Sequence, residues 1–139
     1  MDSDRLLQFI NDASQNTLMQ TLGIKFLEAS QDRVVATMPV TPKVHQPDGV
    51  LHGGASVALA ETVGSFASVL NIDREKQMVR GLEISANHLR GKSEGIVTAT
   101  ARPLHKGKTT HLWEIRIEDE NHKLISLCKL STIILSKNK

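Results

Sequence analysis

Apolar side chains recur at helical spacing twice near the start of the chain. In residues 4–13 they share one side of a short helix, at Leu6, Leu7, Phe9 and Ile10. A second short helical turn is predicted over residues 17–22, where Gly23 follows as a stop signal. We therefore expect two short helices before the first strand.

The next apolar runs have the composition of strands. Residues 24–28 and 34–40 flank a polar turn at 30–32, and this arrangement predicts a β-hairpin. Residues 41–49 contain two prolines and a glycine, so we expect a loop there.

The longest helix is predicted over residues 53–70. Apolar and small residues recur there at helical spacing, at Ala55, Ala58, Leu59, Thr62, Val63, Phe66, Ala67 and Leu70. Four β-like runs follow at 78–88, 95–104, 109–118 and 123–135, with a turn at 119–122 before the last.

Strands in series with a single long helix predict an α+β fold with an antiparallel sheet. The helix must bury its apolar stripe, and a twisted sheet wrapped around it is the simplest arrangement that does so. No repeat or linker divides the chain, and its 139 residues are predicted to form one domain, 1–139.

One carboxylate stands out on the long helix. Glu61 is the only ionisable residue between His52 and Asp73, and Ser65 lies one turn beyond it. A helical wheel places Glu61 about 150° from the apolar stripe, on a side shared with small residues (Gly54, Val57, Gly64 and Ser68). One interpretation is an ordinary solvated face. The other is a subunit interface that encloses a lone charge, where removal from water would make the carboxylate a stronger base.

The residues that lead into this helix suggest acyl chemistry. Leu51-His52-Gly53-Gly54 places glycines in the first turn, where backbone N–H groups are unpaired and the helix dipole is positive. A substrate carbonyl can approach such a backbone, which is the geometry that stabilises an oxyanion. A tight turn with only a capping role is the alternative.

Composition narrows the possible classes of function and partner further. The net charge is +2, and only four residues are aromatic, so nothing favours a nucleic-acid partner. Cys128 is the sole cysteine, which fits a reducing compartment and a core position better than a nucleophile. The acidic start of the chain and the lack of a long apolar segment predict a soluble, cytoplasmic protein without a membrane partner.

Three segments carry a family resemblance. Residues 45–62, 81–90 and 103–108 resemble the PaaI-like hot-dog thioesterases, nearest to the 1,4-dihydroxy-2-naphthoyl-CoA and Arthrobacter-type 4-hydroxybenzoyl-CoA thioesterases. The resemblance implies a hot-dog fold, in which the sheet wraps the helix. It also implies a homo-oligomer, with a dimer of dimers expected, in which two subunits join their sheets and the active site lies between them.

The resemblance also implies roles for individual residues. Glu61 would act as nucleophile or as general base for water, and the Gly53 amide would hold the thioester oxygen. Gln46 and His52 would position the thioester and the water, and Ser65 would orient the water or the carboxylate. No metal or cofactor is expected, since CoA is part of the substrate.

CoA-binding positions are implied in three places. These are Gly81, then His88, Leu89, Arg90 and Gly91, then His105, Lys106, Gly107, Lys108, Thr109 and Thr110. Their positive charges suit the nucleotide phosphates, although an ordinary basic turn is the alternative for residues 106–108. Gly91 and Leu89 depart from residues common in close relatives, which affects the expected loop stiffness and substrate contact.

The expected activity is hydrolysis of an acyl-CoA thioester, with an aromatic acid of the 1,4-dihydroxy-2-naphthoyl type suggested by the subgroup and menaquinone biosynthesis as its most specific form. One alternative is a proofreading thioesterase that releases acyl or aryl groups from a carrier protein. A non-catalytic acyl-CoA sensor and a hot-dog dehydratase fit less well. The sensor usually has an attached DNA-binding domain and the dehydratase a different helix context.

Overall fold

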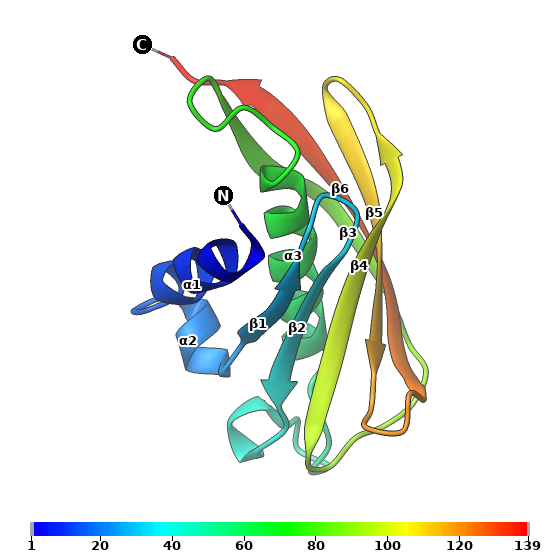
Figure 1. Ribbon diagram of the computed structural model, residues 1–139. Coiled ribbons are helices and arrows are strands. Elements are labelled where there is room, and N and C mark those ends of the chain that lie inside the picture. The colour runs from blue at the N-terminus through cyan, green and yellow to red at the C-terminus, as the bar shows by residue number, and fades with distance from the viewer. Residues whose placement is uncertain (1, 139) are drawn as a thin grey trace.

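The computed structural model describes residues 2–138 and shows one antiparallel sheet curled around one long helix (Figure 1). The helices are α1 (Ser3–Ala13), α2 (Leu18–Leu22) and α3 (Gly53–Val69), with a 3₁₀ turn at Pro42–Val44. The strands are β1 (Lys25–Ala29), β2 (Val34–Pro39), β3 (Gln77–His88), β4 (Ile96–Lys106), β5 (Thr110–Glu118) and β6 (Leu124–Ser136). This confirms the predicted α+β hot-dog architecture, and every predicted element is present with small shifts at its ends.

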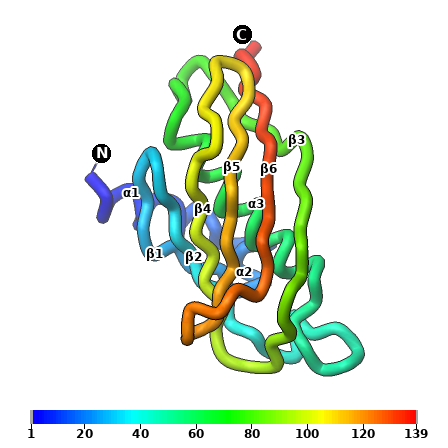
Figure 2. Tube along the Cα trace, turned by 90° about the vertical axis from the view of Figure 1, so that its right-hand side faces the viewer, coloured from blue at the N-terminus to red at the C-terminus, as the bar shows by residue number. Residues whose placement is uncertain are grey.

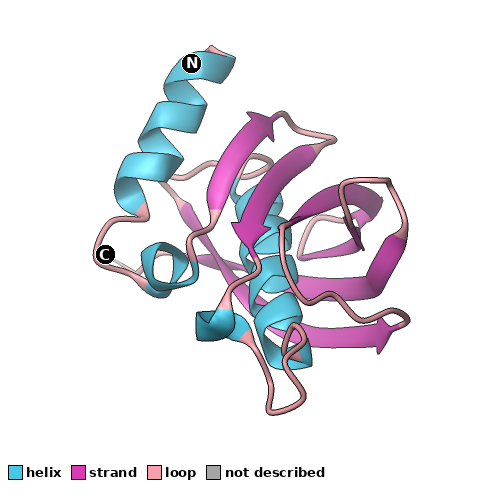
Figure 3. Ribbon diagram, turned by 90° about the horizontal axis from the view of Figure 1, so that it is seen from below, coloured by secondary structure: helices cyan, strands magenta, loops and turns pink. Residues whose placement is uncertain are grey.

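The strand order β1-β2-β4-β5-β6-β3 explains how the helix is held. All neighbouring strands are antiparallel, and α3 contacts β2, β3, β4, β5 and β6. Figure 3 shows α3 within the curve of the sheet, with α1 and α2 on its other side. The sheet therefore covers more of the helix circumference than one face.

The start of each helix follows from a capping side chain. Asp2 accepts a hydrogen bond from the Arg5 amide at α1, and Thr17 accepts one from the Met19 amide at α2. Helix α2 ends at Gly23, whose φ of +72° is a left-handed conformation that favours glycine. A side chain there would also lie 2.9 Å from the Pro39 ring.

The core lies between α3 and the concave side of the sheet. Trp113 and Ile115 of β5 alternate inward along their strand and are fully buried, and Phe26 meets Phe66 edge to face at 5.1 Å. Cys128 is buried in this core, and burial raises the pKa of its thiol to about 11. The thiol is therefore protonated at neutral pH, which supports the structural interpretation of Cys128.

The rotation of α3 differs from the helical-wheel prediction. Gly64 and Ser68 were expected to face away from the sheet with Glu61, but both are buried against it. A Cβ on Gly64 would lie 2.7 Å from Leu130 Cδ2 of β6. The small-residue face is therefore partly a consequence of close packing inside the subunit, because the curled sheet reaches both sides of the helix.

Two edges end the sheet, and they differ. At one edge β1 is short and packs against α1, whereas at the other β3 has 12 residues and is mostly exposed. Figure 2 shows β3 running alongside β6 at this end of the sheet.

None of the helices within residues 2–138 is long and apolar enough to cross a membrane.

Candidate active site

The first turn of α3 leaves one backbone donor free. His52 caps the helix, since its Nδ1 accepts a hydrogen bond of 2.7 Å from the Gly54 amide. The Ala55 and Ser56 amides donate to the His52 carbonyl. Within residues 2–138 the Gly53 amide has no protein acceptor. It is therefore available to a ligand oxygen at the positive end of the helix dipole.

The loop before α3 is held in place by backbone bonds. The Gln46 amide donates to the Val50 carbonyl over 2.8 Å, and the Leu51 amide donates to Lys92 in the β3–β4 connection over 2.7 Å. The Gln46 side chain accepts a hydrogen bond from the Asp48 amide. These bonds place Gln46 beside the start of α3.

A bulge in β3 brings His88 to the same place. The register between β3 and β6 shifts between Gly81 and Glu83, so that Gly81, Ile84 and His88 all face α3. His88 Nε2 lies 2.7 Å from the position that a Cβ on Gly53 would take. Only glycine at position 53 leaves room for the ring.

These groups line a first cavity of about 390 Å³. It brings together six of the predicted site residues (Gln46, Gly53, His88, Leu89, Arg90 and Gly91). The cavity also contains Ser126 of β6, which the sequence interpretation missed. His52, by contrast, is the helix cap and does not line this cavity.

Glu61 lies in a second cavity, of about 530 Å³. Ser65 lines the same cavity, so the structure brings this predicted pair together. The other walls are largely apolar and come from α1, α2, β1 and α3 (Ile10, Leu18, Met19, Phe26, Ala58, Thr62, Phe66 and Val69). Among the described residues, Glu61 is the only charged side chain in the lining.

Gly81 makes room for the Glu61 carboxylate. A Cβ at position 81 would lie 2.6 Å from Glu61 Oε2, so any side chain there would displace the carboxylate. The resemblance implied a CoA contact at Gly81. The structure places this glycine beside the Glu61 carboxylate, and the CoA contact stays a prediction.

A single chain does not bring Glu61 to Gly53. The two residues are eight positions apart on α3, which is roughly 12 Å along a helix axis, and they line different cavities. A single chain therefore does not hold the two groups in one cavity.

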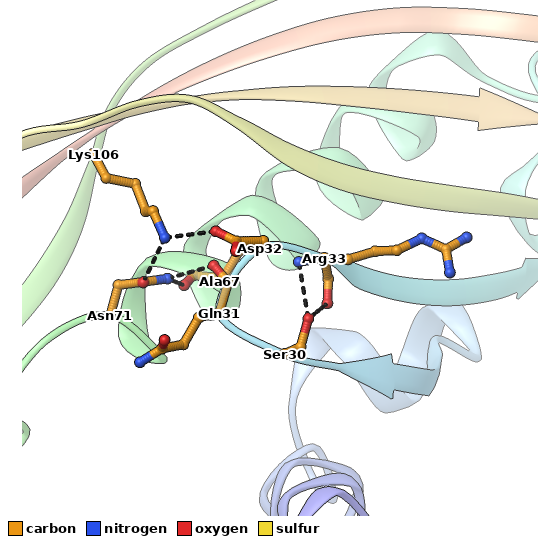
Figure 4. A network of polar contacts seen from close by, with 7 residues as sticks. All are labelled: Ser30, Gln31, Asp32, Arg33, Ala67, Asn71 and Lys106. Atoms are coloured by element: carbon orange, nitrogen blue, oxygen red, sulfur yellow. Dashed lines mark hydrogen bonds and ion pairs between the residues drawn. The ribbon is translucent and has the colours of Figure 1, made fainter.

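The β4–β5 hairpin is also remote from the first cavity. Lys106 donates to Asp32 over 2.6 Å and to Asn71 over 3.2 Å, at the C-terminal end of α3 (Figure 4). Neither cavity includes any of the other predicted CoA residues of this hairpin (His105, Gly107, Lys108, Thr109 and Thr110). Lys106 is thus engaged within the subunit, whereas Lys108 is exposed and has no ion pair within residues 2–138.

A buried polar cluster lies near the hairpin but outside both cavities. Ser68 Oγ lies 2.7 Å from Thr132 Oγ1, 2.9 Å from His111 Nδ1 and 2.7 Å from Trp113 Nε1. Burial lowers the pKa of His111 most, and the nearby charges of Lys106 and His105 lower it further.

Within the described residues, no three or more His, Cys, Asp or Glu side chains lie close enough together to hold a metal ion.

The curled sheet, the long helix and its lone carboxylate define the hot-dog class of thioester hydrolases. The sequence model of the thioesterase superfamily matches residues 48–126, and the chain belongs to this family. It is therefore a thioesterase, as the sequence predicted.

Named relatives support the family over nearly the whole chain. The 1,4-dihydroxy-2-naphthoyl-CoA hydrolase of Listeria monocytogenes is 44% identical, over 88% of this chain and 98% of its own. The proofreading thioesterase EntH of Cronobacter turicensis is 46% identical, over 93% of each chain. The crystal structure of a mutant thioesterase from Pseudomonas aeruginosa superposes with a TM-score of 0.92 at 42% identity, covering 94% of each chain.

Proposed function

We propose that the protein hydrolyses an acyl-CoA thioester with an apolar, aromatic acyl group to the free acid and CoA. The observation that carries this proposal is the position of Glu61 as the one charge on an otherwise largely apolar cavity of about 530 Å³. A thioester carbon beside the carboxylate would place the acyl group against Ile10, Met19 and Phe66. An uncharged ring suits these walls, because burying an acyl charge beside Glu61 would be unfavourable.

The proposed chemistry needs water and no cofactor. As general base, Glu61 accepts a proton from water while the water oxygen bonds to the thioester carbon. The charge that develops on the carbonyl oxygen is held by the Gly53 amide, and the carbon–sulfur bond then breaks to release the CoA thiolate. As nucleophile, Glu61 would instead form an acyl anhydride that water opens. A single turnover in ¹⁸O-water distinguishes the two, since only the second route labels the Glu61 carboxylate.

We also propose that a second copy completes the site. The long exposed edge of β3 offers unpaired backbone groups, and Leu82 in β3 and Leu89 just after it are 59% and 60% exposed. A two-fold axis beside this edge would extend the sheet and bring Glu61 of one subunit towards Gly53 of the other. This geometry accounts for the separation of the two groups in one chain.

Activity on a panel of thioesters, followed with a thiol-trapping reagent, tests the proposed reaction. Glu61→Gln keeps the shape and removes the basic carboxylate, so kcat on the preferred substrate should fall at least about 10²-fold. A loss below about threefold would reject Glu61 as the reacting group.

Mixed subunits test the shared site. Glu61→Gln and Gly53→Ala homodimers should both be inactive, whereas a refolded equal mixture should recover up to about a quarter of the wild-type rate. No recovery in a mixture that forms heterodimers, or full activity of a monomer by sedimentation, contradicts the shared site.

The second candidate substrate is an acyl or aryl group on a carrier protein. It is favoured by the 46% identity to a relative named as a proofreading thioesterase. Comparing kcat/KM for one acyl group on CoA and on a carrier protein decides between the two. A ratio strongly in favour of the carrier protein would replace the CoA proposal.

A further inference from the structure

The buried Ser126 and the exposed His88 form a hydrogen-bonded pair on neighbouring strands. His88 ends β3 and lies opposite Ser126 of β6 in the strand register. Ser126 Oγ lies 2.8 Å from His88 Nδ1, and the serine is only 1% exposed. Both residues line the first cavity, and the His88 ring lies beside Gly53.

The buried hydroxyl determines which ring nitrogen carries the proton. Within the described residues His88 Nδ1 is the only hydrogen-bond partner of the Ser126 hydroxyl. A buried hydroxyl that accepted a bond from Nδ1–H would leave its own proton without an acceptor, which is unfavourable. We infer that Ser126 donates to Nδ1, so that the neutral imidazole carries its proton on Nε2.

The Nε2 edge of the ring is directed at Gly53. A Cβ on Gly53 would lie 2.7 Å from His88 Nε2 and 3.0 Å from Cδ2, so the ring lies against the glycine backbone. The Gly53 amide beside it is free within residues 2–138. Two N–H donors from separate elements therefore lie next to each other in one cavity.

We propose that His88 Nε2–H is a second donor to the thioester carbonyl oxygen and that Ser126 is the positioning residue that holds the ring for this task. The proposal rests on the proposed thioester hydrolysis. Negative charge grows on the carbonyl oxygen as the carbon becomes tetrahedral, and donors fixed beforehand stabilise it most effectively. No proton leaves His88 in this step, and the carbonyl forms again when the carbon–sulfur bond breaks.

Amide replacements of the histidine test which nitrogen matters. His88→Gln carries an N–H donor near the Nε2 position, whereas the shorter His88→Asn places its amide near Nδ1. His88→Asn should lower kcat by about 10²-fold, as loss of an oxyanion donor does, and His88→Gln should lose at most about tenfold. Equal activity of the two variants would overturn the donor assignment.

Ser126 is tested with a matched control on the same strand. Ser126→Ala should lower kcat about tenfold with little change in KM, and Ser126→Thr, which keeps a hydroxyl, should restore most of the rate. Ser131→Ala is the control, because Ser131 lies on β6 away from the cavity and should leave the rate unchanged. If Ser126→Ala raises only KM, and only for CoA thioesters over pantetheine thioesters, His88 contacts the nucleotide and the proposal is wrong.

The tautomer can be measured without any substrate. Long-range ¹⁵N–¹H correlation of the wild-type protein should show His88 with a protonated Nε2 and a bare Nδ1, and Ser126→Ala should mix the two tautomers. A protonated Nδ1 in the wild type would refute the inference even if the protein hydrolyses thioesters. If the protein acts on no thioester in the panel, the proposed function fails while this spectrum still reports on the Ser126 bond.

Discussion

At its first turn α3 presents the Gly53 amide, which has no acceptor within residues 2–138, to a cavity of about 390 Å³. Near its last turn the Ser68 hydroxyl is bonded to three buried side chains instead. Unused donors beside a cavity can act on a ligand, and satisfied buried groups hold the fold together. We therefore expect the same helix to carry chemistry at one end and stability at the other.

Among the variants that test this difference between the two ends of α3, Gly53→Ala is expected to have the largest effect on activity. The new methyl group would lie 2.7 Å from His88 Nε2, so it should displace the ring and lower kcat/KM by about 10²-fold or more. Thermal unfolding should change little, because alanine is favourable in a helix. In a His88→Ala background the methyl group has room, and the added loss should shrink. An undiminished loss there would mean that the methyl group acts elsewhere.

Paired serine variants one turn apart should separate the two roles. Ser68→Ala leaves three buried partners unpaired and should destabilise the fold by about 2–4 kcal/mol in urea unfolding, with kcat preserved in the folded fraction. Ser65 lines the Glu61 cavity. Ser65→Ala should change the free energy of unfolding by at most about 0.5 kcal/mol, and it should lower kcat by less than Glu61→Gln does. A loss of kcat from Ser68→Ala, or a large loss of stability from Ser65→Ala, would contradict these separate roles of the two serines.

The stability of the Ser68 end should depend on pH through His111. Burial lowers the folded pKa of His111 below its ordinary value of 6.5, so the unfolded chain takes up this proton first as the pH falls. Stability is therefore full above pH 6.5 and is lost through the window below it, by at most about 1.4 kcal/mol per pH unit. Urea unfolding between pH 7.5 and 5.5 should show a smaller slope for His111→Gln than for the wild type. Identical slopes would exclude His111 as the cause.

The smallest effects are expected at the β4–β5 hairpin, where two nearby lysines differ. Lys106→Ala breaks the pair with Asp32 and should reduce stability by at most about 1 kcal/mol. Lys108→Ala should leave stability unchanged and raise KM about threefold for CoA thioesters but not for pantetheine thioesters. If Lys106→Ala gives the larger KM effect, the phosphate releases Lys106 from Asp32 on binding.

The sequence predicted the fold and the family in detail because both depend on local signals. Helical spacing over residues 53–70 and alternation in the later strands identified the elements and their order, and the structure and the family match confirmed them. A carboxylate isolated on a helix of small residues identified Glu61, and glycines at a helix start identified Gly53. The structure places both beside cavities, while their roles stay predictions.

Long-range geometry decided the rest. A helical wheel assumes one buried side, but the sheet curls far enough to bury Gly64 and Ser68 as well. The pairing of Lys106 with Asp32 depends on how the β4 end meets the β1–β2 turn, 74 positions apart in the chain.

What the sequence alone determined is therefore the kind of each element, the thioesterase family and the two groups on α3 with the most suggestive chemistry. Only the tertiary structure decided that Glu61 and Gly53 line separate cavities, that Gly81 makes room for the carboxylate and that Ser126 holds His88. The physical reason is that element type follows from neighbours within a few residues. The meeting of β3 and β6 depends on a register and a bulge that involve residues roughly 40 to 60 positions apart.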